Sequence, residues 1–491
     1  MDPEARDLLV TAILYCVPLL ALAAATGAGA ADLLVGAATT SITPDKPVAL
    51  CGQFHTRISR AVDNPLTATA LAIESRDGAK SLDQAVLVSC DLSCIWGTTQ
   101  QQLAERLKTR LPDLDTAKLV LNATHTHTAP VLIEGQYDIP KEGVMQPAEY
   151  MEFLLDRLSD VVAKAWESRK PGGVSWALGH AVVGYNRRAA YENGTSRMYG
   201  NTDTPDFRSI EGYEDHSVDM LFFWDAEPKP IAIAINLACT SQEVEGRSTI
   251  NADFWHDVRE AVHKRYSPEV CVLGWTSPAG DQSPHLLYNK AAEERMRAKR
   301  GLTRMQEIAR RILRTVDDVF EIAKGDIRTA PPLVHRVQTL ELPVRKVTPQ
   351  EHAAAKARYE QLAAKPERTS PEHMHMRRAQ RVVERFEQQE ANAVYAMELH
   401  VVRLGDVAIA TNPFELYLDY GVQIKARSRA VQTFLIQLAC ATAQYLPTER
   451  AVRGGHYSAE AVDNTCGPEG GKVLVNRTVE AINALWPGDA K

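Results

Sequence analysis

Short apolar runs alternate with longer amphipathic segments along most of this 491-residue chain, and this alternation limits the folds open to it. Five runs are mainly apolar and bounded by polar or small residues, as buried strands are: Ala85–Cys90, Lys118–Asn122, Val218–Phe223, Ile231–Leu237 and Val270–Trp275. Four longer segments have helical patterns: Thr99–Leu111, Pro147–Arg169, Phe254–Arg265 and Thr303–Lys324. Strands that alternate with helices in this way predict an α/β fold.

The second half of the chain departs from this regular alternation. The strand-like segments Val334–Leu342 and Glu398–Arg403 are not separated from their neighbours in the same way, which predicts mixed sheets. Residues 349–392 are rich in Ala, Glu, Arg and Gln and predict one or two exposed helices. We interpret them as a helical insertion over the core, with a lid or a dimerisation arm as the alternative. The expected fold class is α/β, with mixed central β-sheets and flanking helices.

Composition and charge exclude some classes of partner. The chain is 45% hydrophobic and 24% charged, which suits a sizeable globular core. Its formal net charge of -7 gives no basic surface for a nucleic acid. No linker rich in Pro, Gly or Ser divides the chain, so we expect one domain over residues 32–491.

The N-terminus predicts export from the cytoplasm. Leu8–Ala31 carries no charge and ends in the small residues Ala28, Gly29 and Ala30, as a secretory signal does. We expect a signal peptide over residues 1–31 and a secreted, periplasmic or otherwise extracytoplasmic protein, with a retained membrane anchor as the alternative. Removing Cys16 with the signal leaves seven of the eight cysteines, so at least one thiol is free unless it pairs between chains.

The sharpest local motif is Thr124–Thr128, which directly follows the strand-like Leu119–Leu121. If the extended conformation continues, His125 and His127 lie on the same face of the strand, beyond its C-terminal end. Two adjacent imidazoles are natural zinc ligands, although two hydrogen-bonded core histidines would have the same spacing. A second such pair, His373 and His375, lies in a helical segment where the two side chains do not face each other.

Three further motifs carry polar groups at or beyond strand ends. Ala279–Pro284 presents Ser283 after the strand-like run that ends at Trp275. Asn412–Glu415 presents the carboxylate of Glu415 after the strand-like run Val407–Ala410. Tyr445 and Tyr457 follow near the end of the chain. Taken singly, each has a structural interpretation: a capped turn for Ser283, a helix N-terminal acid for Glu415, and boundary core residues for the tyrosines.

Taken together, these motifs resemble the neutral/alkaline non-lysosomal ceramidases. The same order holds for the opening Ala38–Pro44, the THTHTAP segment, Asn186–Arg188, AGDQSP, PFE and the late tyrosine pair, from about residue 36 to 460. The resemblance implies a zinc ion held by His125, Glu415 and Tyr445. It also implies catalytic or substrate-binding roles for His127, Ser283, Arg187 and Tyr457. Zinc lowers the pKa of bound water to about 7 and polarises carbonyl groups.

Two departures from the family pattern affect these expectations. The family has a further zinc histidine at a strand end, but here Ile233–Ala238 leads into Cys239–Gln242 without one. We prefer His216 as the replacement. The alternatives are Asp253, His256, Cys239 and His285. Only 34 residues follow Tyr457, too few for the immunoglobulin-like domain that family members commonly carry.

We therefore expect a zinc amidohydrolase that acts on linear N-acyl amides, ceramide or a related lipid among them. A lipid substrate would bring the protein into peripheral contact with a membrane. One alternative is the same fold cleaving a different amide or ester. The other is a non-catalytic binding protein with a degenerate metal site, which the missing histidine suggests.

Overall fold

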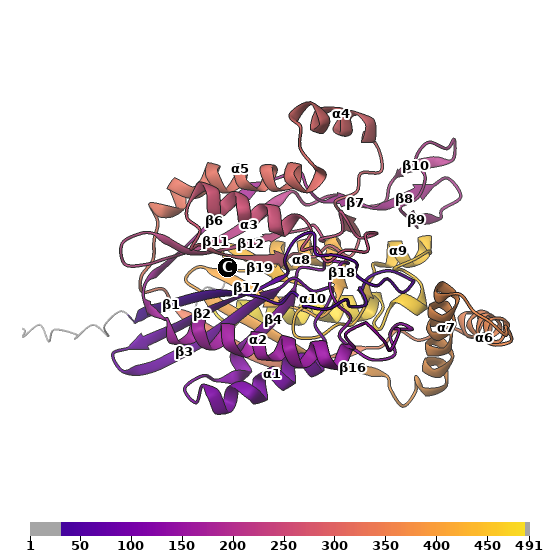
Figure 1. The fold of residues 1–491 in the computed structure, drawn as a ribbon, viewed down its shortest axis with the longest axis horizontal. Coiled ribbons are helices and arrows are strands. Elements are labelled where there is room, and N and C mark those ends of the chain that lie inside the picture. Colours follow the sequence, from indigo (N-terminus) through magenta and orange to yellow (C-terminus); the bar gives the residue numbers. More distant parts are fainter. Residues whose placement is uncertain (1–30, 487–491) are drawn as a thin grey trace, which may run out of the picture. The chain divides into compact units, whose positions relative to one another are not determined.

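The computed structural model describes residues 31–486, whose first sheet has the strand order β4-β3-β2-β1-β5 (Figure 1). Its strands are β1 (Asp32–Ser41), β2 (Thr67–Asp77), β3 (Lys80–Cys90), β4 (Leu119–Ala123) and β5 (Lys170–Pro171). Strands β3 and β4 are parallel, so helix α1 (Gly97–Arg110) makes the crossover between them. Helix α2 (Pro147–Glu167) packs beside α1 and covers the same face of the sheet.

The second sheet has the order β13-β12-β11-β6 and is also mixed. Its strands are β6 (Gly173–His180), β11 (Ser217–Trp224), β12 (Pro230–Leu237) and β13 (Cys271–Thr276). Helix α3 (Phe254–Arg265) connects the parallel pair β12 and β13, and α5 (Arg304–Lys324) lies beside it. Both helices bury their apolar stripes, including Phe254 and Ile312, against this sheet.

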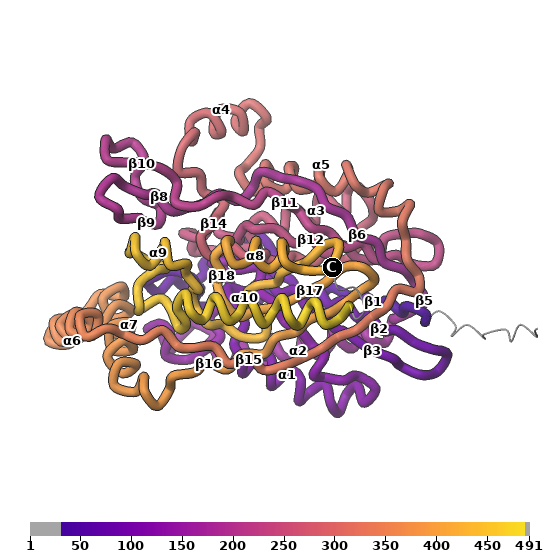
Figure 2. Tube along the Cα trace, turned by 180° about the vertical axis from the view of Figure 1, so that it is seen from behind, coloured from indigo at the N-terminus to yellow at the C-terminus, as the bar shows by residue number. Residues whose placement is uncertain are grey.

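The third sheet has the order β15-β16-β17-β19. Its strands are β15 (Leu333–Pro343), β16 (Val394–Leu404), β17 (Val407–Thr411) and β19 (Gln432–Ile436). Helix α8 (Leu418–Arg427) connects the parallel pair β17 and β19, and α10 (Pro468–Asn483) lies along the outer face of the sheet (Figure 2).

The inner faces of the three sheets meet in one apolar core. Leu71 of the first sheet, Trp275 of the second and Phe434 of the third belong to the same buried cluster. Alternate residues of β2 explain this: Leu71 faces the shared core, whereas Ala70 faces the helices. Because these strands are buried on both faces, they appear in the sequence as continuous apolar runs, and the predicted α/β class with mixed sheets is confirmed.

The predicted helical insertion is also confirmed. Helices α6 (Pro349–Ala363) and α7 (Ser370–Gln388) pack against each other as a hairpin and project beyond the sheets (Figure 1). Each helix begins with a capping box, at Thr348 and Thr369. Val382 of α7 packs with Val347 and Ala461, which fixes the hairpin to the C-terminal region of the domain.

Short strands and helices beyond the sheets position polar groups. They are β7 (Tyr185–Asn186), β8 (Arg188–Tyr191), β9 (Ser196–Met198), β10 (Phe207–Ile210), β14 (Gln282–Ser283), β18 (Glu415–Leu416), β20 (Tyr445–Leu446), α4 (Lys290–Arg300) and α9 (Glu449–Gly454). Strand β14 pairs with β7, and β18 pairs in parallel with β20. These two small ladders join loops that are far apart in the sequence.

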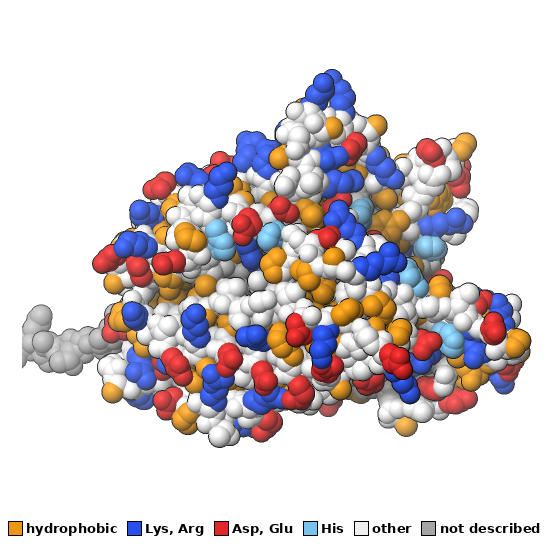
Figure 3. Space-filling view, in the orientation of Figure 1, with side chains coloured by type: hydrophobic (Ala, Val, Ile, Leu, Met, Phe, Trp, Pro, Cys, Tyr) orange, Lys and Arg blue, Asp and Glu red, His pale blue; other side chains and the backbone are white. Residues whose placement is uncertain are grey.

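The surface and the cysteines complete the description of residues 31–486. Basic side chains gather over α4, whereas acidic and basic groups intermix over α1 and α2 (Figure 3). All seven cysteines in this part of the chain are free. None of its helices has the length and apolar character needed to cross a membrane. The predicted signal segment, apart from Ala31, lies outside the described residues.

Candidate active site

The Thr124–Thr128 segment leaves strand β4 beside a buried ion pair. Arg259 of α3 donates to both carboxylate oxygens of Asp91, at 2.7 and 2.9 Å. Thr124 Oγ1 donates to the same carboxylate at 3.3 Å, and the peptide N–H of His125 donates to Leu92 O at 2.9 Å. The end of β3 and helix α3 therefore fix the point from which the histidines project.

The two histidines converge, although the expected extended backbone is not what brings them together. His125 has φ 68°, a left-handed conformation, so the strand ends before it. The rings of His125 and His127 nevertheless lie 4.7 Å apart at 77°, with their Nε2 atoms 3.3 Å apart. The prediction of neighbouring imidazoles holds, but the reason given for it was wrong.

The hydrogen bonds of His125 determine which nitrogen is available. Its Nδ1 lies 2.6 Å from Ser93 O, which can only accept, so Nδ1 carries the proton in the neutral ring. The lone pair of Nε2 therefore points to the other side of the ring. Glu415 Oε2 lies 3.3 Å from this atom.

Glu415 supplies a half-buried carboxylate from a distant part of the chain. Strand β18 places it opposite Tyr445 in β20. Burial raises the pKa of Glu415, but His125, Arg187 and Tyr445 outweigh burial and bring it below its usual value. Its Oε2 is inaccessible to solvent and has no hydrogen-bond partner in the structure. A buried carboxylate oxygen without a hydrogen bond is costly unless a cation is beside it.

These donors fit a zinc ion. In a tetrahedral site with metal–ligand bonds of about 2.05 Å, neighbouring ligand atoms lie about 3.3 Å apart. The separation of 3.3 Å between His125 Nε2 and Glu415 Oε2 matches that value. The lone pair of His125 and the unpartnered oxygen of Glu415 are therefore both available to one ion.

Three hydrogen-bond donors lie beside this pair. Tyr445 Oη and Tyr457 Oη are 3.2 Å apart, and Arg187 Nη2 lies 3.4 Å from Tyr445 Oη. Arg187 is 1% exposed, and its Nη2 also donates to Gly280 O at 2.9 Å. Burial raises the pKa of both phenols above the ordinary value for tyrosine, so they stay protonated.

Two residues beside His127 have no counterpart among the predicted site residues. His127 Nδ1 lies 3.2 Å from Glu245 Oε2, an arrangement in which Nδ1–H donates and Nε2 keeps its lone pair. Gln242 Nε2 lies 2.9 Å from His127 Nε2, while Gln242 Oε1 accepts from Arg187 at 3.1 Å. Gln242 ends the Cys239–Gln242 segment, where the resembled family has a further zinc histidine. The resemblance therefore indicated the loop that meets His127 but did not indicate Gln242 itself.

The structure does not place His216, the predicted further metal ligand, among the residues that line the cavity described below. His216 Nε2 pairs with Glu214 at 3.3 Å, and its ring lies edge-on to Tyr185. It directly precedes β11. The other candidates, Asp253, His256, Cys239 and His285, do not line the cavity either, although His285 Nε2 lies 3.8 Å from Glu245 Oε1.

Ser283 contacts residues next to His127 and does not contact His127 itself. It is completely buried in β14, opposite Tyr185 of β7, and its Oγ accepts the N–H of His285 at 3.2 Å. His285 Nε2 in turn lies 2.8 Å from Gln242 O. The serine is thus connected to His127 through His285 and Gln242 and does not line the cavity.

Asp281, two residues before Ser283, joins the loops that carry the polar groups. Its carboxylate accepts from Asn186 Nδ2 and from the N–H of Leu418, each at 2.9 Å. Its carbonyl accepts the N–H of Arg187 at 2.9 Å. Burial raises the pKa of Asp281 to about 6.

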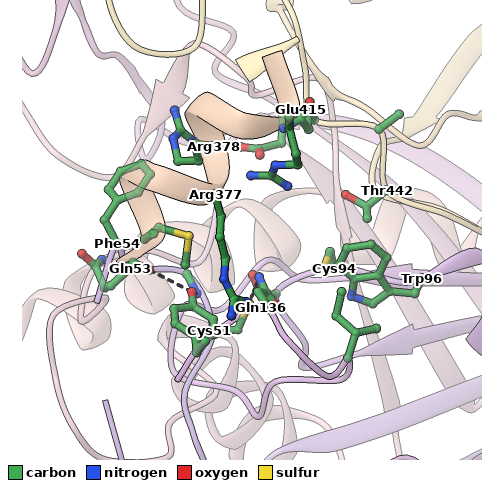
Figure 4. Close-up of a pocket in the computed structure, with 18 of the residues that line it drawn as sticks. Cys51, Gln53, Phe54, Cys94, Trp96, Gln136, Arg377, Arg378, Glu415 and Thr442 are labelled. Carbon is green, nitrogen blue, oxygen red and sulfur yellow. Dashed lines mark hydrogen bonds between the residues drawn. The ribbon is translucent and has the colours of Figure 1, made fainter. Parts of the chain in front are cut away.

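A cavity of about 680 Å³ opens in front of the histidines. His125, His127, Glu415, Tyr445 and Tyr457 line its floor. Its outer walls come from Cys51–Phe54, Cys94, Trp96, Gln136, Arg377, Arg378 and Arg381. Arg377 reaches from α7 toward Gln136 across this space (Figure 4). The helical insertion therefore contributes one wall of the cavity.

Two solved structures share this fold. The crystal structure of neutral ceramidase from Pseudomonas aeruginosa matches 94% of this chain and 76% of its own, with a TM-score of 0.66 and 17% identity. A ceramidase complexed with C2 matches 93% of this chain and 75% of its own, with a TM-score of 0.65 and 15% identity. No family model and no curated protein matches the sequence. The resemblance to neutral ceramidases is confirmed at the level of the fold.

Proposed function

We propose that this chain, which has the neutral ceramidase fold, is a zinc-dependent hydrolase of N-acyl amide bonds. The observation that carries the proposal is the 3.3 Å approach of His125 Nε2 to the unpartnered, buried Oε2 of Glu415. Tyr445, opposite Glu415 in the β18–β20 ladder, is proposed as the third ligand. When bound, zinc would polarise an amide carbonyl and lower the pKa of a water molecule.

The side chains around this position have the chemistry that amide hydrolysis needs. With Nδ1–H directed at Glu245, His127 has its lone pair on Nε2, where the Gln242 amide donates at 2.9 Å. A proton taken up at Nε2 would replace this hydrogen bond. Glu245 holds the imidazole in one tautomer and one orientation.

Tyr457, which lines the cavity, is proposed to donate a hydrogen bond to the negative charge that develops on the carbonyl oxygen. Arg187 does not line the cavity and is proposed to support this charge through its contact with Tyr445. The burial of Arg187 and Tyr445 strengthens this stabilisation, because little water competes for the charge.

Ser283 is proposed to act on the reaction through its neighbours. Its Oγ accepts the N–H of His285, and His285 contacts the carbonyl of Gln242. The Gln242 amide nitrogen lies against His127. Replacing Ser283 by alanine should leave zinc bound and lower turnover, whereas an unchanged rate would restrict the hydroxyl to a role in folding.

A second candidate substrate class has support from the cavity wall. Arg377 and Arg381 are one helical turn apart on α7 and both line the cavity. Within residues 31–486, neither has a carboxylate within salt-bridge distance. Ceramide carries no charge, so these guanidinium groups favour an N-acyl compound with a carboxylate or another anionic group. Secretion through the N-terminal signal remains part of the proposal.

The test is a hydrolysis assay of the purified, zinc-loaded protein. Ceramide and an N-acyl amino acid of the same acyl length are compared as substrates. Faster hydrolysis of the N-acyl amino acid would favour the anionic N-acyl compounds as the substrate class. His125→Ala should abolish turnover, whereas His373→Ala, in the helical pair that does not line the cavity, should not. Equal turnover in the two variants would refute the proposed site. A protein that binds these compounds without cleaving them would instead be the binding protein considered above.

A further inference from the structure

A second group of metal-ligand residues lies outside the candidate active site. Within residues 31–486, Glu398, His400 and Cys440 are the group of three whose ligand atoms all lie within 4.8 Å of one another. Glu398 and His400 are two residues apart on strand β16 and share a face. Cys440 follows strand β19 in the loop that leads to Tyr445. None of the three lines the active-site cavity.

The hydrogen bonds of His400 require a positive charge at this position. His335 Nδ1 lies 3.1 Å from Gln84 O, and His335 Nε2 lies 2.9 Å from His400 Nδ1. His400 Nε2 then lies 2.7 Å from Glu398 Oε1. This row ends in an acceptor on both sides, so its three contacts need three hydrogens. Two neutral imidazoles supply only two.

The missing charge is either a proton or a metal ion. With Nδ1 of His335 donating to Gln84 O and Nδ1 of His400 donating to His335, the lone pair of His400 Nε2 faces Glu398. A proton would satisfy this contact alone, and Cys440 would then serve only as a packed residue of the apolar cluster that the three sheets share. A metal ion would widen the 2.7 Å contact between His400 Nε2 and Glu398 Oε1 to the separation of about 3.3 Å expected between zinc ligands. It would also use the sulfur of Cys440, which is 5% exposed.

We propose that Glu398, His400 and Cys440 bind a divalent cation of the zinc class. Imidazole nitrogen, thiolate sulfur and carboxylate oxygen are together the ligand types that zinc prefers. His335 accepts the Nδ1–H of His400 and holds the ring in the tautomer that presents Nε2 to the ion. The Glu398 side chain is 47% exposed, so a water molecule completes the coordination from that side.

The site would have a structural role, because it fixes a loop of the active site. The N–H of Cys440 donates to Leu121 O of β4 at 2.8 Å, and the N–H of Ala123 donates to Leu438 O at 3.2 Å. The same loop carries Leu438 into the cavity wall and continues to Tyr445. An ion at Cys440 would therefore hold this loop to strand β16.

Cobalt substitution tests the proposal, because a thiolate bound to Co²⁺ gives a near-ultraviolet charge-transfer band that nitrogen and oxygen ligands do not. The full chain with His125→Ala is loaded with Co²⁺, so that the proposed active-site ion does not contribute. We expect the band at one equivalent, its loss in Cys440→Ser, and its retention in Cys271→Ser on β13. Glu398→Gln should keep the fold and weaken Co²⁺ binding at least about 10-fold.

The outcomes separate this site from the active site. Absence of the band in the folded His125→Ala protein, or its persistence in Cys440→Ser, would overturn the proposal. If Cys440→Ser does not fold, unchanged Co²⁺ affinity in Glu398→Gln overturns it instead. Loss of hydrolysis in His125→Ala with the band retained would support both sites independently.

Discussion

Gly52 is the position at which one added methyl group should disable His127. Its φ of 104° is a backbone conformation that side chains rarely adopt. A Cβ built there would lie 2.3 Å from Cγ of His127 and 2.7 Å from its Nδ1. Carbon atoms in contact are normally about 3.5–4.0 Å apart, so the imidazole must move by about 1 Å or more.

Gly52→Ala therefore has two costs that can be separated. The positive φ costs about 1–2 kcal/mol with any side chain. The overlap with His127 adds about 1–3 kcal/mol, as in other overpacked sites. Moving the ring also breaks its 3.2 Å contact with Glu245. A displacement of about 1 Å in a catalytic group lowers turnover by about 100-fold.

Gly78→Ala is the matched control. Gly78 has φ 58° and would have nothing within 4 Å of an added Cβ. Urea unfolding and hydrolysis of an N-acyl substrate are measured for both variants. The control should lose about 1 kcal/mol and no activity, whereas Gly52→Ala should lose more stability and most turnover. Wild-type kcat in a folded Gly52→Ala protein would refute the role given to His127.

Three further predictions follow from other contacts. Arg259→Met leaves the buried Asp91 carboxylate without its ion-pair partner and should cost about 3–5 kcal/mol in urea unfolding, whereas an Asp91→Asn/Arg259→Met double variant should recover part of the loss. Glu245→Gln should lower kcat more than it raises KM, because the neutral amide stabilises a protonated His127 less than the carboxylate does, while Glu243→Gln should not; equal effects would refute the pairing. Hydrogen bonds from Arg310 and Arg311 lower the pKa of Glu307 to about 2, so its contribution to stability is full above the unfolded pKa of about 4.3 and is lost as the pH falls toward 2. The free energy of unfolding of the wild type should therefore fall more than that of Glu307→Gln when the pH is lowered from about 5 to about 3. Parallel curves of unfolding free energy against pH would contradict this.

The α/β class and the helical insertion could be predicted because they depend on local patterns. The runs Val218–Phe223 and Ile231–Leu237 are the neighbouring strands β11 and β12, and residues 349–392 contain α6 and α7. Strand β2 (Thr67–Asp77) was missed. Its residues 68–73 are apolar or small on both faces, and periodicity does not distinguish such a continuous run from a buried helix. The register that brings strands together depends on contacts across the whole chain.

The site shows the same division between local and long-range information. His125 and His127 stand out as a pair in the sequence, but the left-handed φ of His125 does not. Glu245 was missed because nothing in its local sequence indicates that it meets His127. The place of His216 outside the cavity lining could not be predicted, because its position before β11 says nothing about which loop it faces. Cys440 and His400 meet only once the third sheet has formed.

Anomalous diffraction on crystals of the zinc-loaded protein tests the central claim most directly. A peak at the zinc edge should lie about 2.0–2.2 Å from both His125 Nε2 and Glu415 Oε2, next to the phenol of Tyr445. A second peak at Glu398, His400 and Cys440 is expected from the further proposal and is independent of the first. If His125 and Glu415 instead share only a proton, with no anomalous density between them, zinc-dependent hydrolysis at this site is contradicted.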